Sequence, residues 1–163
     1  MLMNATPKRK RAPRPEPVVN VQFATRAAST PSPARFRAWA RAALMRNAHI
    51  TLRIVATREA RTLNKRYRGR DYATNVLTFV YPEQRPLAGD IALCAPVIRR
   101  EARAQQVGLA AHYAHLTVHG VLHLQGFDHL KTHEAERMER LEARILKKLG
   151  YDDPYRSEMA KKS

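Results

Sequence analysis

The chain has 163 residues, 44 % of them hydrophobic, so it is long enough for one domain with its own buried core. Its single cysteine, Cys94, excludes an intrachain disulfide, and no apolar run is long enough for a membrane span or a signal peptide, which favours a cytoplasmic protein. Thirty Lys and Arg against fourteen Asp and Glu give a formal charge of +16, which favours nucleic acid as a partner.

Composition changes along the chain divide it into three parts. Residues 1–17 are basic, rich in proline and poor in apolar residues, and such a segment buries too little surface to offset the entropy of ordering it. We therefore expect a disordered basic extension at 1–17, a single folded domain at 18–155 and a disordered tail at 156–163.

The first half of the domain is predicted to alternate strands with helices. Residues 18–23 have the β-branched content and the alternation of a strand, and apolar residues recur at helical spacing over 36–44. A second strand is expected at 50–56. Thr57 belongs to the residue types that cap helices, so it predicts the start of a helix over 58–66.

The second half is predicted to hold two more strands, at 75–81 and 90–94, before a series of helices. Pro96 suits the first turn of a helix that runs to about Gln106. The segment 110–125 is apolar around most of its circumference, which is typical of a central, buried helix.

The last predicted helix runs over 132–149, with Met138 and Ile145 on its inward face. Gly126 and Gly150 follow the last two helices, where glycine readily adopts the left-handed conformation that ends a helix. This order of elements predicts an α+β fold, with one sheet of about four strands and about five helices packed on it.

Three histidines at the end of the predicted central helix form the candidate site. His119 and His123 are four residues apart, so their imidazoles project from one face of the helix, one turn apart. His129 follows Gly126, where the chain leaves the helix and can bring a third nitrogen to the same point. Three imidazoles leave one position of a tetrahedral ion open, which is typical of a catalytic site. The pattern predicts a metal-dependent hydrolase with His119, His123 and His129 as ligands.

Neighbouring residues leave alternatives open. A register in which His115 binds the ion is one, although a third ligand on one straight helix would lie about 6 Å further along the axis. His133 is expected to be exposed on the last helix. Asp128 fits equally well as a partner that orients a ligand imidazole and as an ordinary turn residue.

The spacing of the three histidines equals that of the zinc-protease motif HExxHxxGxxH, with one departure. Gly120 stands where those enzymes carry the glutamate that acts as general base. The geometry therefore favours a hydrolase, and the missing carboxylate argues against a protease.

Several separate motifs resemble those of one known family. Residues 119–129, HGVLHLQGFDH, are similar to the pattern H-G-x-L-H-L-x-G-Y-D-H, and residues 63–79, LNKRYRGRDYATNVLTF, are similar to LN-x-x-YRGKD-x-x-TNVLSF. LAGDI at 87–91 resembles LLGDI, and GYDDPY at 150–155 also fits. All these patterns belong to the YbeY-type rRNA-maturation endoribonucleases.

The resemblance covers the chain from about residue 50 to 155, with the motifs in the right order. The departures within the motifs are mild: Phe127 replaces tyrosine, Thr78 replaces serine, and Val80 stands where proline is usual. The long basic N-terminus is a further difference, and it does not bear on the chemistry.

Membership in this family would imply a mixed sheet flanked by helices, with a zinc ion held by three histidines in a cleft at the central helix. It would also imply cleavage of single-stranded RNA, maturation of the 3′ end of small-subunit rRNA, ribosome quality control, and the ribosome with its associated proteins as partners. The functional arginine of the family matches Arg68, whose guanidinium can fork onto a phosphodiester. Asp90 is a candidate for positioning Arg68 or a ligand histidine.

The nucleophile and three rival functions stay open at this point. No residue stands out as a general base, so an activated water and the 2′-hydroxyl of the RNA are both candidate nucleophiles. A zinc metalloprotease-like hydrolase shares the ligand spacing, and a non-catalytic ribosome-binding protein with a structural metal would explain both the charge and the histidines. A metal-dependent deaminase or phosphatase is a third alternative, although the sequence lacks the P-C-x-x-C motif of the deaminases.

Overall fold

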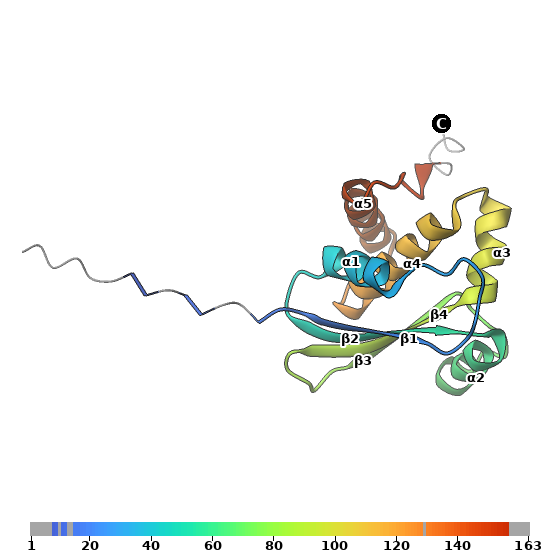
Figure 1. The fold of residues 1–163 in the computed structure, drawn as a ribbon, viewed down its shortest axis with the longest axis horizontal. Helices are drawn as coiled ribbons and strands as arrows, with labels where there is room; N and C mark the ends of the chain where they lie inside the picture. Colours follow the sequence, from blue (N-terminus) through green and yellow to red (C-terminus); the bar gives the residue numbers. More distant parts are fainter. Residues whose placement is uncertain (1–7, 10, 13–14, 129, 157–163) are drawn as a thin grey trace, which may run out of the picture.

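The structure is a computed structural model that describes residues 8–9, 11–12, 15–128 and 130–156. Its strands form one sheet in the order β1-β2-β4-β3 (Figure 1). The strands are β1 (Val18–Phe23), β2 (Ala48–Val55), β3 (Val76–Tyr81) and β4 (Leu87–Cys94). β1, β2 and β4 run parallel, and β3 pairs antiparallel with β4 at one edge, so the sheet is mixed.

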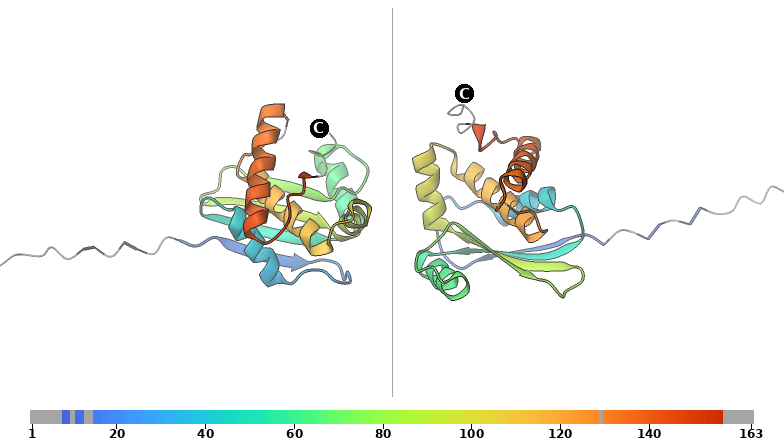
Figure 2. Two further views of the ribbon diagram at one scale, coloured as in Figure 1. Left: turned by 90° about the horizontal axis from the view of Figure 1, so that it is seen from above. Right: turned by 180° about the vertical axis from the view of Figure 1, so that it is seen from behind.

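Five helices in the described part of the chain pack around this sheet. They are α1 (Pro33–Ala43), α2 (Thr57–Arg68), α3 (Ala95–Gln105), α4 (Leu109–Leu124) and α5 (Thr132–Lys148). In Figure 1, α1, α4 and α5 lie above the sheet and α2 lies below its right-hand end, and the view from behind in Figure 2 shows the same two sides. The predicted α+β class and mixed sheet are therefore confirmed.

The main core lies between the sheet and the helices α1 and α4. Alternate residues of β2, such as Leu52 and Ile54, point into it and are fully buried. Phe36 of α1 and Tyr113 of α4 pack edge to face there, with ring centres 5.5 Å apart. α2 covers a smaller apolar cluster on the other side, which contains Cys94, and burial raises the pKa of this thiol.

Helix α4 approaches the sheet closely at two glycines. A Cβ atom on Gly120 would lie 3.0 Å from Cγ2 of Ile91, and a Cβ atom on Gly89 would overlap the side chain of Leu124 of α4. Gly120 therefore faces β4, and a glutamate at this position would crowd the side chain of Ile91. The packing of α4 thus favours a small residue where the zinc proteases carry their base.

The ends of the last two helices agree with the sequence prediction. Gly126 and Gly150 have φ angles of +99° and +91°, a region in which glycine has no steric penalty. Among the described residues, no helix combines the length and the apolar character that a membrane span requires. The segments predicted to be disordered, 1–17 and 156–163, lie largely outside the described ranges, and the domain boundaries remain predictions.

Two predicted boundaries are wrong. Thr57 does not cap α2: the N-cap is Ala56, whose side chain offers no acceptor, and Thr57 is already the first helical residue. β4 begins at Leu87, three residues earlier than expected, because Leu87 pairs with Ala48 of β2. Both errors concern element ends, where a partner distant in sequence or the path of the backbone decides the boundary.

Candidate metal centre on helix α4

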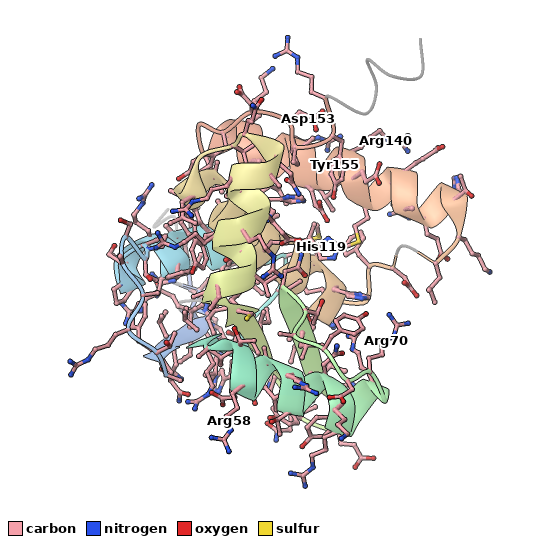
Figure 3. The ribbon with its side chains drawn as sticks, turned by 90° about the vertical axis from the view of Figure 1, so that its right-hand side faces the viewer. Arg58, Arg70, His119, Arg140, Asp153 and Tyr155 are labelled. Atoms are coloured by element: carbon pink, nitrogen blue, oxygen red, sulfur yellow. The ribbon has the colours of Figure 1, made fainter. Side chains whose placement is uncertain are left out.

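Four histidines form a column along one side of α4: His112, His115, His119 and His123. Their ring centres follow one another at 6.1, 6.4 and 5.9 Å. The column runs from a buried end to a more open one, since the side chain of His112 is 4 % exposed and that of His119 is 22 % exposed. In the view of Figure 3, His119 lies between Tyr155 above and Arg70 below.

His119 contacts a buried carboxylate from α5. Its Nδ1 lies 2.6 Å from Oε1 of Glu142, a residue with no exposed surface. An ionised carboxylate can only accept a hydrogen bond, so Nδ1 of His119 carries the proton and donates it. In the neutral ring, the lone pair that can bind a metal is then on Nε2, at the other end of the imidazole.

His123 has the same tautomer for a different reason. Its Nδ1 lies 2.8 Å from the backbone oxygen of Phe127, which is also only an acceptor. The turn at Gly126 brings this oxygen back to the helix, and the amide of Phe127 donates to the backbone oxygen of Leu122 at 3.2 Å. Both histidines thus donate through Nδ1 and keep the basic lone pair on Nε2, as metal-binding histidines with an outer partner do.

Glu142 has two further partners on its other oxygen. Nε2 of His115 lies 3.1 Å from Oε2, and the hydroxyl of Tyr155 donates to the same oxygen. Burial alone would raise the pKa of Glu142, but the hydrogen bonds from His115, His119 and Tyr155 outweigh it and lower the pKa to about 2. Glu142 is therefore held as a carboxylate.

His115 belongs to the surroundings of Glu142. Its Nε2 lies 3.1 Å from both the carboxylate of Glu142 and the hydroxyl of Tyr155, whose ring packs edge-on against it with centres 5.4 Å apart. Nε2 of His115 donates to the carboxylate of Glu142, so this nitrogen has no lone pair for a metal. This arrangement speaks against the register in which His115 is a ligand.

The donors that the structure describes fit a divalent ion. Two imidazoles on one tetrahedral ion at about 2.0–2.1 Å have ring centres about 5 Å apart, and the centres of His119 and His123 are separated by 5.9 Å. The third expected ligand, His129, lies outside the described residues, and within those residues no group of three His, Cys, Asp or Glu side chains could hold an ion. An all-imidazole set suits zinc and several other first-row ions.

Arg68 is the last residue of α2, and the fold fixes the backbone around it. Gly69 follows with φ of +68°, and its amide donates to the backbone oxygen of Lys65 at 3.0 Å, which is the αL type of helix ending. The side chain of Arg68 is exposed, and it forms no hydrogen bond or ion pair with any described residue. The guanidinium of Arg68 is thus uncommitted among the described residues, and it forms no hydrogen bond with the histidines of α4.

The loop that follows Arg68 is anchored at two points. The guanidinium of Arg61 forms a bidentate pair with Asp71, with N–O distances of 2.7 and 3.1 Å. The side-chain amide of Asn64, which is almost fully buried, donates to the backbone oxygen of Tyr72 at 2.8 Å. These contacts hold the residues after Gly69 in place beside the end of α2.

Asp90 and Asp128 were both open as partners of the candidate ligand histidines, and the structure places Asp90 on the far side of the sheet from helix α4. Gly89 and Ile91 face α4, so strand alternation turns Asp90 to the other side of the sheet, where it accepts a hydrogen bond from the hydroxyl of Tyr81. The expectation that Asp90 positions a ligand histidine is therefore wrong. Asp128 accepts the amide of Leu130 at 3.3 Å, which is a turn contact but not the only interaction of this residue.

Sequence reasoning missed Glu142 and Tyr155. A weak signal for Glu142 exists, because it lies four residues after Met138 and three before Ile145, on the inward face of α5. A charged residue in an apolar stripe needs a buried partner. For Tyr155, which follows the last helix, the signal is its place at the end of the GYDDPY motif, 150–155, which does not say what the hydroxyl contacts.

Comparison with known proteins is consistent with this geometry. A family model described as Endoribonuclease YbeY matches residues 23–150. A protein named Endoribonuclease YbeY from Methylobacillus flagellatus is 54 % identical over 148 residues, which covers 91 % of this chain and 99 % of that protein. One of the same name from Nitrosomonas eutropha is 55 % identical over 137 residues, covering 84 % of this chain and 97 % of that protein.

A solved structure supports the fold. The solution structure of a Thermotoga maritima protein matches with a TM-score of 0.54 and 19 % identity, and covers 84 % of this chain and 98 % of that one. At this identity the likeness concerns the arrangement of strands and helices only.

Proposed function

This chain belongs to the endoribonuclease YbeY family, and we propose that it cleaves single-stranded RNA with a divalent ion, zinc above all, held by His119, His123 and His129. Such an enzyme acts on RNA phosphodiester bonds, so RNA is its substrate. Maturation of the 3′ end of small-subunit rRNA, ribosome quality control and binding to the ribosome are part of the same proposal. The formal charge of +16 supports a polyanionic partner.

One observation carries the metal proposal: His119 and His123 are neighbours and both donate through Nδ1 to fixed acceptors, Glu142 and the backbone of Phe127. These contacts set the ring orientation and leave the lone pair on Nε2, which is the arrangement of ligand histidines. Lewis-acid activation at a phosphodiester is the chemistry that a divalent ion supplies in such a site.

Arg68 is proposed to bind the phosphate of the substrate. Its guanidinium is exposed at the end of a helix whose following loop is anchored, and it is committed to no described partner. A guanidinium matches two phosphate oxygens at once and stays charged through the reaction. In this role Arg68 orients the RNA and stabilises the charge that develops on the phosphate.

The test compares wild type with His123→Asn on a defined single-stranded RNA. Asparagine keeps a donor near the position of Nδ1 for the Phe127 carbonyl and removes Nε2, so the helix end is preserved. We expect one metal ion per wild-type chain by elemental analysis, loss of cleavage on chelation and its return with zinc. The His123→Asn variant should bind far less metal and cleave no RNA. A wild type that binds metal without cleaving RNA would support a structural ion instead.

Two further substrates separate the remaining alternatives. Cleavage of an RNA with a single 2′-deoxy nucleotide at the scissile position would exclude the 2′-hydroxyl as nucleophile and leave water. Hydrolysis of casein with RNA untouched would favour the protease alternative, for which Gly120, packed against Ile91, offers no base.

A further inference from the structure

We propose that Glu142 and Tyr155 are positioning residues of the metal centre: Glu142 fixes His119 and raises its affinity for the ion, and Tyr155 fixes Glu142. This inference rests on the proposed function, because it assigns roles to residues that act through a proposed ligand. It concerns two residues from different parts of the chain, one on α5 and one beyond its end.

The first argument is the burial of Glu142. A carboxylate with no exposed surface has lost its hydration, and such a group persists only where hydrogen bonds replace the lost water. Of its two oxygens, Oε1 lies 2.6 Å from Nδ1 of His119, and Oε2 accepts from Tyr155 and from His115 at 3.1 Å. Two of these donors, His115 and His119, belong to the column of histidines on α4, and the third, Tyr155, packs against His115.

The second argument is the effect of a carboxylate on an imidazole. A hydrogen bond from Nδ1–H to a negative acceptor increases electron density on Nε2 and fixes the plane of the ring. At His123 the described partner of Nδ1 is the neutral carbonyl of Phe127. Glu142 therefore makes His119 a stronger donor than a histidine whose Nδ1 meets only a neutral acceptor.

The third argument is the position of Tyr155. The segment after Gly150 folds back over the column, and the amide of Tyr155 donates to Oδ1 of Asp153 at 2.8 Å, which turns the chain at this point. The hydroxyl then reaches Glu142, and the ring packs edge-on against His115. Figure 3 shows Tyr155 above His119, with Asp153 above it in turn. Without this hydroxyl, Oε2 of Glu142 keeps only His115.

The chain offers a matched control for each residue. Glu101 is a carboxylate that contacts a histidine of the same helix, His112, at 3.1 Å, two turns away from the proposed ligands. Tyr151 is a tyrosine of the same C-terminal segment, and its hydroxyl accepts from Arg35 at 2.9 Å rather than donating to Glu142. Glu101→Gln and Tyr151→Phe thus repeat both chemical changes away from the centre.

The experiment measures zinc affinity of the full chain by competition with a chromophoric chelator, beside the visible spectrum of the Co(II)-substituted protein. Glu142→Gln keeps an oxygen acceptor for His119 but removes the charge, and we expect zinc affinity to fall about 10–100-fold. Tyr155→Phe should lower affinity in the same direction by a smaller factor. The Co(II) spectrum should shift in Glu142→Gln, and both controls should match wild type.

The possible results separate the two proposals. Should wild type bind zinc and cleave RNA while Glu142→Gln and Tyr155→Phe bind zinc within twofold of wild type, this inference is overturned and the proposed function stands. Should wild type bind no zinc, both fall. An equal loss of affinity in Glu101→Gln would indicate a general effect of charge removal and would also overturn the inference. If Glu142→Gln does not fold, Tyr155→Phe against Tyr151→Phe decides alone.

Discussion

Helix α4 carries two imidazole–carboxylate pairs, and their differences show what separates a structural histidine from a candidate metal ligand. His112 meets Glu101 of α3 at 3.1 Å, with the histidine 4 % and the glutamate 30 % exposed. His119 meets Glu142 of α5 at 2.6 Å, with the histidine 22 % exposed and the glutamate fully buried. The burial of the two partners is thus reversed between the pairs.

The nitrogen used in each pair is also reversed. His112 contacts its carboxylate through Nε2, the end of the ring that points away from the backbone, whereas His119 uses Nδ1, next to its own helix. When Nε2 donates a hydrogen bond to a carboxylate, the outer end of the imidazole has no lone pair left for a metal. We conclude that residue types and spacing do not distinguish the two pairs, and that ring orientation and burial do.

The largest expected effect tests whether metal binding and RNA cleavage need His119 but not His112. His119→Asn retains a donor for Glu142 and removes Nε2, so we expect loss of bound metal and a fall in the rate of RNA cleavage of about a thousandfold or more. His112→Gln keeps a donor near the position of Nε2 for Glu101 and should cleave RNA at nearly the wild-type rate. Equal losses of RNA cleavage in both variants would contradict the distinction between the two imidazole–carboxylate pairs.

The next effect concerns stability at acid pH in the metal-free protein. The pKa of Glu142 is about 2 in the folded chain against an ordinary 4.5, so its stabilising effect is complete above pH 4.5 and is lost as the pH falls toward 2. The loss is on the order of 3 kcal/mol. Urea unfolding between pH 6 and 2.5 should show a shallower decline for Glu142→Gln than for wild type, and parallel curves would contradict the assignment.

His112 should titrate in a different window. Burial lowers the pKa of His112 below its ordinary 6.5, although Glu101 opposes this, so the folded chain favours the neutral ring. Its contribution to stability is therefore present above pH 6.5 and decreases as the pH falls toward the lowered folded pKa. The His112→Gln variant should lack this part of the pH dependence in urea unfolding at pH 7.5 and 5. A slope equal to that of wild type would show that His112 does not contribute it.

The smallest expected effect concerns His115, which lies between the two pairs. Glutamine at this position keeps a donor near Nε2 for Glu142, so His115→Gln should change zinc affinity by no more than about twofold. A loss of zinc affinity as large as that of His119→Asn would identify His115 as a ligand, as in the alternative ligand set that the sequence left open. Zinc competition on the two variants side by side gives the answer.

Much of the fold follows from local sequence patterns. Alternation in residues 18–23 and 50–56 and the apolar segment 110–125 predicted β1, β2 and α4 within a few residues, because periodicity reports which face of an element is buried. The start of β4 at Leu87 was missed, since it depends on pairing with Ala48, about forty positions away in the sequence.

In the candidate site, too, local spacing predicted some features and contacts between distant segments decided the others. The spacing of His119 and His123 placed two imidazoles on one side of α4, since residues four apart on a helix are neighbours. The roles of these two histidines and of His129 as metal ligands remain predictions, and so does the role of Arg68 in binding phosphate. The contact between His119 and Glu142 spans two helices, and no periodicity within either helix encodes it.

The sequence by itself determined the α+β class, the order of the elements, the charge that favours RNA and the histidines from which a metal centre can be built. Only the tertiary structure decided which nitrogen each ring presents, because that depends on acceptors supplied by α5 and by the turn after α4. It also decided that Asp90 faces away from α4 and that Tyr155 closes over Glu142. Local patterns fix what each segment becomes, and the packing of distant segments fixes what each side chain meets.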